Sequence, residues 1–548
     1  MNPSASAAAL VARLKHIADT SPTSAIDEAL RLQVWTQTSP WHCKDVLCYC
    51  AQLAASVGEW RLAGLAAYQA QRLHLTASGE AARWGLPMLP GLEVAARQFN
   101  LVRHVPLRSK NVLLRRPEAG DRDFLTSMFS DPAFMRLYCR PAYGRVEWRV
   151  YHLIRGDQQC PQARDPWAWI VCNSHGEPLG LMELTPPNYF QGSADLALGF
   201  HQAHFGTLAA EAYVLGAFIA FHHLDLVRVT GHVYGDNHHS GKLDSRMGMV
   251  PEYTVEGMVG DALTGEDVAV TVYSMLRDEF SQWPRVKRIV RHFFSPTAPD
   301  LLLDQIDALS KQIVALGPSW RLFPPPAVPM IVRPASPDTR EERDKDTQGQ
   351  TLAESLPAQL DGRRVRLRAL QKEDEDVVTE WLGRDDFFVA CPHYFDILDD
   401  LGALLGRYLA RSRELRLWLI EELSHGGDAP APIGLIGLEF HNDRPLVFVV
   451  AGFVSSASYR PVRQAWRLIQ QAIVERFPGA MVYAKTPLDS AGHALLSRSR
   501  NWQSCGIERG FRVGESRQPR DMALFRWWPT KSCCSFLQNS RLCYSCPD

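Results

Sequence analysis

Apolar residues follow a helical period at the start of the chain and a mixture of periods afterwards. Within residues 1–105 small and apolar residues recur at helical spacing, most regularly in residues 46–75, and this pattern predicts helices only. From residue 111 to residue 295 apolar runs of strand length alternate with helical segments. The predicted strands are 111–117, 166–173, 178–185, 193–200, 228–234 and 266–276, and the predicted helices are 119–131, 208–224 and 236–249.

The stretch between residues 281 and 358 is predicted to leave this pattern. An amphipathic helix is expected at 299–316, and residues 323–350 then combine clustered prolines with a charged tract that lacks aromatic residues. Such a composition does not bury a core, so it indicates a linker. The basic sequence WPRVKR (283–288) is interpreted as a solvated helix face rather than a nucleic-acid contact.

The pattern of residues 111–280 recurs in residues 361–528. LLRRPEAGDRDFL (113–125) is answered by RLRALQKEDEDVV (366–378), and each places an arginine six residues before an aspartate. The glycine of PLGLMEL follows the valine of the first strand by 68 residues, and the glycine of PIGLIGLEF follows its valine by 69. The terminal strands begin 155 and 156 residues after the same valines. Landmarks that recur in the same order, at spacings that agree to within one residue, predict an internal duplication.

Composition narrows the class of protein. A chain of 548 residues is too long for a single hydrophobic core, and this length predicts three or four domains. With 46% hydrophobic residues, 22% charged residues and a net charge of −1, nothing favours nucleic acid or an anionic membrane as a partner. No apolar run reaches the roughly 18–20 residues of a membrane span, and the start lacks the features of a secretory signal. We therefore expect a cytoplasmic protein.

The twelve cysteines are scattered, and most of them predict reduced thiols. The tail at 531–548 is the exception, because it contains Cys533, Cys534, Cys543 and Cys546. This set holds the ligand type that zinc prefers, but the adjacent pair is poor ligand spacing. We expect no metal site.

The segment DNHHSGKLDSRMGM (236–249) carries the candidate chemistry. Asn237 and Ser240 stand three residues apart, directly after a predicted strand, and Gly248 ends the predicted helix. Asn and Ser also cap helices in proteins without any activity. Capping and catalysis therefore both remain open for this pair.

Four segments in order resemble the GCN5-related N-acetyltransferase (GNAT) family. They are 113–125, HFGTLAAEA (204–212), DNHHSGKLDSRMGMVPEYTVEGMV (236–259) and VAVTVYSMLRDEF (268–280). The first copy resembles the RimJ/RimL-like branch, the ribosomal-protein alanine N-acetyltransferases. The resemblance implies an α/β (α+β) fold with two GNAT-like domains, each with a mixed, splayed central sheet, preceded by an all-helical region. The expected parts are a helical region at 1–105, a first and catalytic GNAT domain at 106–295, a helix and linker at 296–358, a second GNAT domain at 359–530 and a cysteine-rich tail at 531–548.

A second and weaker resemblance concerns the helical region. GEWRLAGLAAYQAQ (58–71) is similar to the second half of a tetratricopeptide repeat, with Gly58, Trp60, Ala63 and Ala70 at the expected offsets. Arrays of this kind usually need three or more repeats. A plain helical cap on the next domain is the alternative.

The GNAT resemblance implies an enzyme that uses acetyl-CoA or another acyl-CoA and transfers the acyl group directly to an amine. It implies a sheet that splays between strands 193–200 and 228–234, with the pantetheine arm bonded to the exposed edge of the former, at Leu198 and Gly199. A helix start suits the pyrophosphate because it offers unpaired N–H groups and the positive end of the helix dipole. The residues implied there are Gly206, Thr207, Leu208 and Ala209.

The resemblance also assigns roles near the thioester. It implies that Ser240 faces the cofactor sulfur and that Asn237 orders the substrate or the pantetheine. No glutamate stands in the place of the general base, and a proton acceptor is needed because the attacking amine must be neutral. The candidates are Asp195, Glu183, His238 and His239, each weighed against a solvated or ion-paired role.

Two departures from the family pattern concern the phosphate. The loop HFGTLAAEA keeps Gly206 but lacks a second glycine and a basic residue, so His201 and His204 either replace those donors or are surface histidines. In the second copy the helix entry, residues 454–469, has no glycine and contains Pro461, which has no N–H to give. The second copy is therefore interpreted as degenerate.

The sequence predicts an acyl-CoA-dependent N-acyltransferase acting on an amine of a peptide or a small metabolite. Two alternatives stay open: a non-catalytic scaffold of two GNAT-like domains, and a transferase that takes its acyl group from a carrier protein. The N-terminal helical region is the expected docking site for a protein partner. The predicted catalytic residues are Ser240, Asn237, Asp195 and His238.

Overall fold

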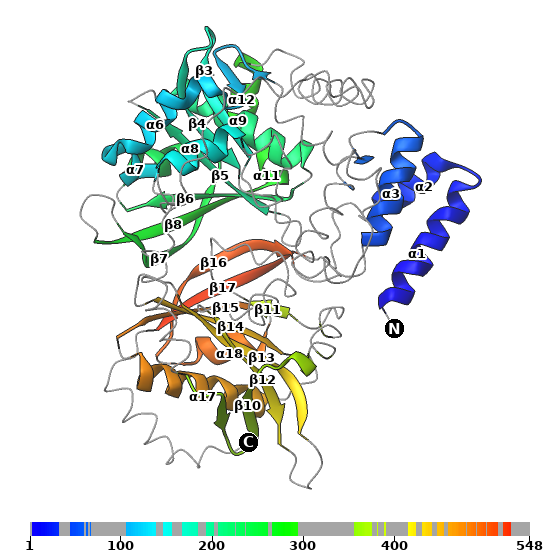
Figure 1. Ribbon diagram of the computed structural model, residues 1–548, viewed down its shortest axis with the longest axis vertical. Coiled ribbons are helices and arrows are strands. Elements are labelled where there is room, and N and C mark those ends of the chain that lie inside the picture. Colours follow the sequence, from blue (N-terminus) through cyan, green and yellow to red (C-terminus); the bar gives the residue numbers. More distant parts are fainter. Residues whose placement is uncertain are drawn as a thin grey trace. The chain divides into compact units, whose positions relative to one another are not determined.

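The structure of the protein is a computed structural model, shown in Figure 1. It describes residues 3–31, 44–59, 62, 63, 66, 106–138, 146–155, 167–184, 193–201, 206–224, 226–235, 237–260, 266–293, 356–374, 377, 381, 388–390, 415–423, 430–440, 446–453, 459–477, 479–488, 490–499, 501–512 and 519–527. By internal contacts the chain divides into two compact units. The first comprises 1–252 with 259–337, and the second comprises 253–258 with 338–548.

Three helices begin the first unit: α1 (Pro3–Ala18), α2 (Pro22–Arg31) and α3 (Lys44–Ser56). They bury small and apolar side chains such as Leu14 and Ala25, which is the pattern that predicted helices in this region. Trp60 and Ala70, two of the four TPR-like positions, lie outside the described residues. The TPR-like interpretation stays a prediction.

The central strands of the first unit correspond to the strands that the apolar pattern predicted. They are β2 (Val112–Arg115), β3 (Trp167–Asn173), β4 (Pro178–Leu184), β5 (Ser193–Phe200), β6 (Arg228–Tyr234) and β8 (Asp267–Leu276). The pattern did not predict β1 (Leu107–Arg108) or β7 (Val250–Gly260), and residues 253–258 of β7 belong to the second unit. β1 to β5 pair in sequence and antiparallel. β5 then pairs with β6 in parallel, and β6 pairs with β8 antiparallel.

Alternating side chains place a separate core on each face of this sheet. Leu114 and Trp169 belong to one cluster of buried residues, and Leu113 and Ile170 belong to the other. The period of two follows from the pleat of a strand. The sequence therefore produces apolar runs rather than strict alternation wherever both faces are covered.

The helices of the first unit cover these two cores. α6 (Arg122–Ser130), α7 (Pro132–Tyr138) and α8 (Val146–Arg155) contribute to the cluster of Leu113. α9 (Thr207–Phe218), which continues into a π-helical turn at Ile219–His223, contributes to the other cluster. The remaining helices are η2 (Ala119–Asp121), α10 (His238–Met247), α11 (Arg277–Gln282) and α12 (Pro284–Phe293).

The second unit repeats the pairing scheme of the first. Its elements are β9 (Gln359–Asp361), β10 (Val365–Ala369), η5 (Lys372–Asp374), β11 (Phe388–Ala390), β12 (Leu415–Glu422), β13 (Ala431–Phe440), β14 (Leu446–Phe453), α17 (Tyr459–Arg476), β15 (Met481–Pro487), α18 (Ala491–Ser497), β16 (Gln503–Arg512) and β17 (Pro519–Trp527). β10, β12, β13 and β14 pair antiparallel in that order. β14 pairs with β15 in parallel, and β15 pairs with β17 antiparallel.

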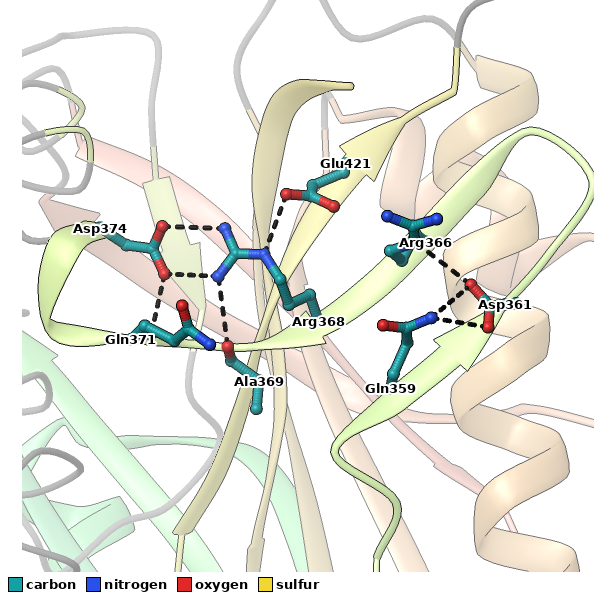
Figure 2. Close-up of polar contacts among 8 residues, drawn as sticks. All are labelled: Gln359, Asp361, Arg366, Arg368, Ala369, Gln371, Asp374 and Glu421. Carbon is teal, nitrogen blue, oxygen red and sulfur yellow. Dashed lines mark hydrogen bonds and ion pairs between the residues drawn. The ribbon is translucent and has the colours of Figure 1, made fainter. Parts of the chain in front are cut away.

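The arginine and aspartate six residues apart form the same clamp in both units. Figure 2 shows Arg368 donating two hydrogen bonds of 2.9 Å to Asp374, whose carboxylate also accepts the Gln371 N–H at 2.8 Å. Arg115 donates two bonds of 2.7 Å to Asp121. Each pair ties the end of a strand to the helical turn that follows it, and the bidentate geometry makes the contact strong. The repeated spacing in the sequence therefore has a structural cause.

The described residues also bear on the expectations for disulfides, membrane-spanning helices and metal sites. Cys50, Cys172 and Cys505 carry no disulfide among them. Within this part of the chain no helix is long and apolar enough to cross a membrane. No group of three or more His, Cys, Asp or Glu residues arranged to hold a metal occurs in the described ranges, and the cysteine-rich tail lies outside them.

Candidate functional site

The two central strands of the first unit separate after a short paired segment. β5 and β6 pair at Ser193 with Arg228, at Ala194 with Val229 and at Asp195 with Thr230. Among the described residues, the rest of β5 up to Phe200 pairs on its β4 side only. The splay that was expected between these strands is therefore present, and it leaves one edge of β5 unpaired.

A cavity of about 270 Å³ occupies the space between the diverging strands. β5 lines it with Asp195, Leu198 and Gly199, among others, and β6 contributes Gly231 and His232. α7, α9 and α10 close it with residues such as Phe134, Tyr213 and Ser240. A concave, mostly apolar site with a few polar groups is the usual form of a small-molecule site.

Gly199 allows α7 to lie close to the face of β5. A Cβ at this position would lie 2.5 Å from Cδ2 of Tyr138 and 2.8 Å from Cζ of Phe134. Only glycine fits this approach without a shift of the two rings. The residue that the resemblance placed on the pantetheine edge thus also determines how the cavity wall packs.

The start of α9 has the form expected of an anion site. Gly206 is the N-cap residue with φ of 107°, a conformation that favours glycine. The first N–H groups of the helix, from Thr207 to Ala209, have no partner within the helix. Ala209 lines the cavity. Of the two histidines considered as phosphate donors, His201 packs edge-to-face on Phe124, and His204 lies outside the described residues.

Asn237 caps α10 and also ties it to α7. Its Oδ1 accepts the Ser240 N–H at 3.2 Å, and its Nδ2 donates to the Leu137 carbonyl at 3.2 Å. Gly248 ends the helix in the left-handed region, with φ of 99°. The capping interpretation therefore describes what Asn237 does in this structure. Asn237 also lines the cavity.

Ser240 lines the cavity, and its hydroxyl makes no hydrogen bond with any residue that the structure describes. His239 lines the cavity as well, whereas His238 does not line it, and both histidines are exposed. Glu183, considered as a proton acceptor, is only 2% exposed. It pairs with Arg149 at 2.9 Å and accepts a hydrogen bond from Tyr138. Its carboxylate stabilises the α7 and α8 side of the sheet.

Three residues of the cavity were not predicted from the sequence. Asp244 is 8% exposed, and burial together with the charge of Asp195 raises its pKa to about 7. Tyr213 is 3% exposed, and its hydroxyl has no hydrogen-bond partner among the described residues. Burial, followed by the charge of Asp244, raises the pKa of Tyr213 well above its ordinary value. Nδ1 of His232, whose side chain is 5% exposed, lies 2.9 Å from Oδ1 of Asp195.

A signal for one of these residues was present in the sequence. Asp244 follows Ser240 by four residues on the predicted helix, and residues at this spacing lie on the same face. Tyr213 gave no such signal, since it stands within an apolar helix. His232 belongs to a strand whose inner face the pattern alone does not identify.

The matching position of the second unit is occupied by the chain itself. β14 pairs with β15 only from Leu446 to Val449. The following residues, Ala451–Phe453, pair with β13 and also with β11. A strand has two edges, and β13 takes one of them. β11 therefore pairs with the edge that is unpaired in the first unit.

Comparison with known proteins gives the family of one part of the chain. Residues 111–250 match the family model of the acetyltransferase (GNAT) domain. No curated protein matches the chain. The spermidine N-acetyltransferase from Vibrio cholerae, solved in complex with CoA and spermine, is 20% identical over 31% of this chain and 98% of that chain, with a TM-score of 0.27.

Two further solved structures are similar to a comparable extent. A GNAT-family protein from Chromobacterium violaceum is 20% identical over 32% of this chain and 89% of that chain, with a TM-score of 0.28. The GNAT-family acetyltransferase from Bacillus anthracis is 16% identical over 32% of this chain and 100% of that chain, with a TM-score of 0.27. These similarities add no argument to the family match.

The family match agrees with the fold and the cavity. The first unit contains a GNAT acetyltransferase domain, which makes this chain an N-acetyltransferase enzyme with acetyl-CoA as its acyl donor. The mixed α/β fold expected from the sequence is confirmed. The cavity residues fit this donor, because β5 offers an unpaired strand edge and α9 offers a glycine-led helix start. The RimJ/RimL-like branch and the duplication stay predictions.

Proposed function

We propose that the first unit transfers an acyl group from acyl-CoA directly to an amine of a peptide or a small metabolite. The observation that supports this proposal is the end of strand pairing at Asp195 and Thr230, with the cavity beyond it. An unpaired strand edge presents N–H and C=O groups in the arrangement that an extended amide-containing chain can join. The pantetheine arm of coenzyme A is such a chain.

Binding would use the two ends of the cleft. The backbone at Leu198 and Gly199 would hold the pantetheine arm, and the N–H groups at the start of α9 would hold the pyrophosphate. Gly206 permits a close backbone approach there. The loop lacks the family's basic residue and second glycine, so we expect weaker affinity than a complete loop would give.

The acyl transfer would take place in the part of the cavity that α10 and β5 line. The free hydroxyl of Ser240 would donate a hydrogen bond toward the sulfur that leaves, and Asn237 would hold α10 against α7 and order the bound groups. Asp195, beside His232, would stabilise the positive charge that develops on the attacking amine. His238 has the weakest support of the predicted catalytic residues, because it is exposed outside the cavity.

We further propose that residues 359–530 are a second GNAT-like copy that has lost acyl-CoA binding. The recurrence of the strand pairing and of the arginine clamp supports a duplication. Pairing of β11 with the edge of β14 supports the loss, because this edge is no longer available to a ligand. Pro461 at the start of α17 removes an N–H that a phosphate would need.

Calorimetry of the full chain with acetyl-CoA tests this proposal. We expect one binding site per chain, abolished by Ser240→Trp, which fills the cavity of the first unit. The matched control is His493→Trp. His493 is the third residue after the N-cap Ser490 of α18, as Ser240 is after the N-cap Asn237 of α10.

The outcomes distinguish the proposal from its alternatives. One site that is lost in Ser240→Trp and kept in His493→Trp supports the proposal. No binding at millimolar acetyl-CoA would favour a non-catalytic scaffold or an acyl donor on a carrier protein. A second site per chain, lost in His493→Trp, would contradict the assignment of a degenerate copy.

A further inference from the structure

Two carboxylates and an unpartnered hydroxyl converge on the cavity of the first unit from three elements. Asp195 comes from β5, Asp244 from α10 and Tyr213 from α9, and all three line the cavity. The Tyr213 hydroxyl is buried without a hydrogen-bond partner among the described residues. A buried polar group without a partner is costly. A hydrogen-bond partner that enters the cavity, either a ligand atom or an ordered water, would satisfy this hydroxyl.

We propose that Asp244 is the general base of the transfer, which takes the proton from the acceptor amine as its nitrogen attacks the thioester. This inference rests on the proposed function and extends it. It names the proton acceptor that the family pattern left unassigned.

The backbone opposite Asp244 leaves room for its carboxylate at the cavity. A Cβ at Gly231 of β6 would lie 3.7 Å from Oδ2 of Asp244. Because β6 has only a hydrogen atom at this position, the carboxylate is not covered by a side chain from that strand. Asp244 lies one helical turn beyond Ser240 on the same face of α10. Both residues therefore serve the same cavity.

The negative charge around Asp244 favours its role as a base toward the attacking amine over a role as an acid toward the departing thiolate. Asp195 and Asp244 are close enough for the charge of one to raise the pKa of the other. Two neighbouring carboxylates stabilise the positive charge that develops on an attacking nitrogen. They oppose the negative charge of a departing thiolate. A pKa of about 7 also suits a base that operates near neutral pH.

The step balances without any further reactant. The C–N bond forms, the C–S bond breaks, and its electron pair leaves on the sulfur. The proton lost by the nitrogen goes to the Asp244 carboxylate and from there to solvent. The thiolate takes a proton from solvent, so the products are the amide and the free thiol.

Other titratable groups lie on the elements that surround Asp244. α12 packs against α10, but its buried residues are apolar, and Arg285, Lys287 and Arg288 are exposed. The titratable residues that share the cavity with Asp244 are Asp131, Tyr138, Asp195, Tyr213, His232, Tyr234 and His239.

The first experiment needs no acceptor. Infrared spectra of the full chain, recorded across pH, follow the protonated carboxyl band that Asp244→Asn removes. We expect this band to disappear with a midpoint near pH 7, and Asp195→Asn to lower that midpoint, since it removes a negative neighbour. A midpoint near the ordinary value of an aspartate, or one that Asp195→Asn leaves unchanged, would overturn the inference.

The second experiment measures turnover against pH with saturating acetyl-CoA. Spermidine and an alanine-initiated peptide serve as probe amines. We expect Asp244→Asn to lower kcat by roughly 100-fold or more, to abolish the rising limb near pH 7 and to leave acetyl-CoA affinity unchanged. Asp244→Glu should restore part of the limb. Asp123→Asn, an exposed aspartate of α6, is the control.

Failure of the inference and failure of the proposed function give different results. Wild-type protein that does not bind acetyl-CoA overturns the proposed function. Wild-type protein that turns over, with an unchanged pH profile in Asp244→Asn, overturns only the role of Asp244.

Discussion

Replacing Asp244 with Asn removes a buried carboxyl group whose ionisation the fold opposes. Burial and the charge of Asp195 raise the pKa of this carboxyl from 3.8 to about 7 in the folded protein. An unfolded chain exposes the group to water and restores its ordinary value. The free energy of unfolding therefore depends on pH through this one residue.

The sign and the size of the effect follow from these two values. Below about pH 4 the carboxyl is protonated in both states, and it contributes no pH dependence. Between about pH 4 and pH 7 only the folded state keeps the proton, so the free energy of unfolding falls as pH rises. A shift of about 3 pKa units corresponds to about 4 kcal/mol. Above about pH 7 the wild-type protein carries this full cost, and Asp244→Asn does not.

Thermal unfolding of wild type and variant at about pH 4.5 and about pH 8.5 measures the effect. The difference between the two proteins should grow between these pH values by an amount that corresponds to about 10 °C for a domain of this size. Using the change between two pH values cancels any packing effect of Asn. The exposed Asp123→Asn variant should show no such change. Equal pH dependence in wild type and Asp244→Asn would refute the reasoning.

Three further predictions concern other residues of the first unit. Ser240→Ala should lower kcat by about tenfold or more, because a hydrogen-bond donor near the leaving sulfur is lost. Calorimetry should show acetyl-CoA affinity within about threefold of wild type. An unchanged kcat would leave Ser240 without a catalytic role. Glu183→Ala leaves Arg149 buried without its partner and should lower the free energy of unfolding in urea by about 3–5 kcal/mol, whereas a loss below 1 kcal/mol would contradict this. Gly248→Ala should lower it by about 1–3 kcal/mol, because φ is 99° and the new Cβ would meet the Trp283 ring at 2.7 Å; unchanged stability would argue against this strain.

The two units share a parallel pair of central strands, but they differ in what lies beside the strand edge beyond that pairing. Each has a parallel pair of strands that separates after a few residues, at Asp195 in the first unit and at Val449 in the second. In the first unit the edge beyond this point borders a cavity, and in the second unit β11 pairs with it. The same pairing scheme can thus leave a strand edge open to a cavity or cover it, depending on whether another strand, such as β11, pairs with that edge.

The sequence by itself determined the central strands of the first unit, the helices α6, α9 and α10, and the order of these elements, but not α7, α8 or β7. The apolar runs at 193–200 and 228–234 coincide with β5 and β6, because a strand buried on both faces must be apolar along its length. The arginine–aspartate spacing marked the two places where the structure forms the clamp, and the N-cap pattern located α10. These signals are local: each depends on residues that are neighbours along the chain, so each can be read without knowing the fold.

Only the tertiary structure decided what the side chains of the site do. Glu183 looked like a candidate base until its partner Arg149, 34 residues away, proved to lie beside it. Asp244 looked like an ordinary polar helix residue until β5 brought Asp195 near enough to raise its pKa. Burial and charge depend on which distant segments the folded chain brings together. The apolar pattern identifies the face that a residue occupies, but not the neighbour it meets there.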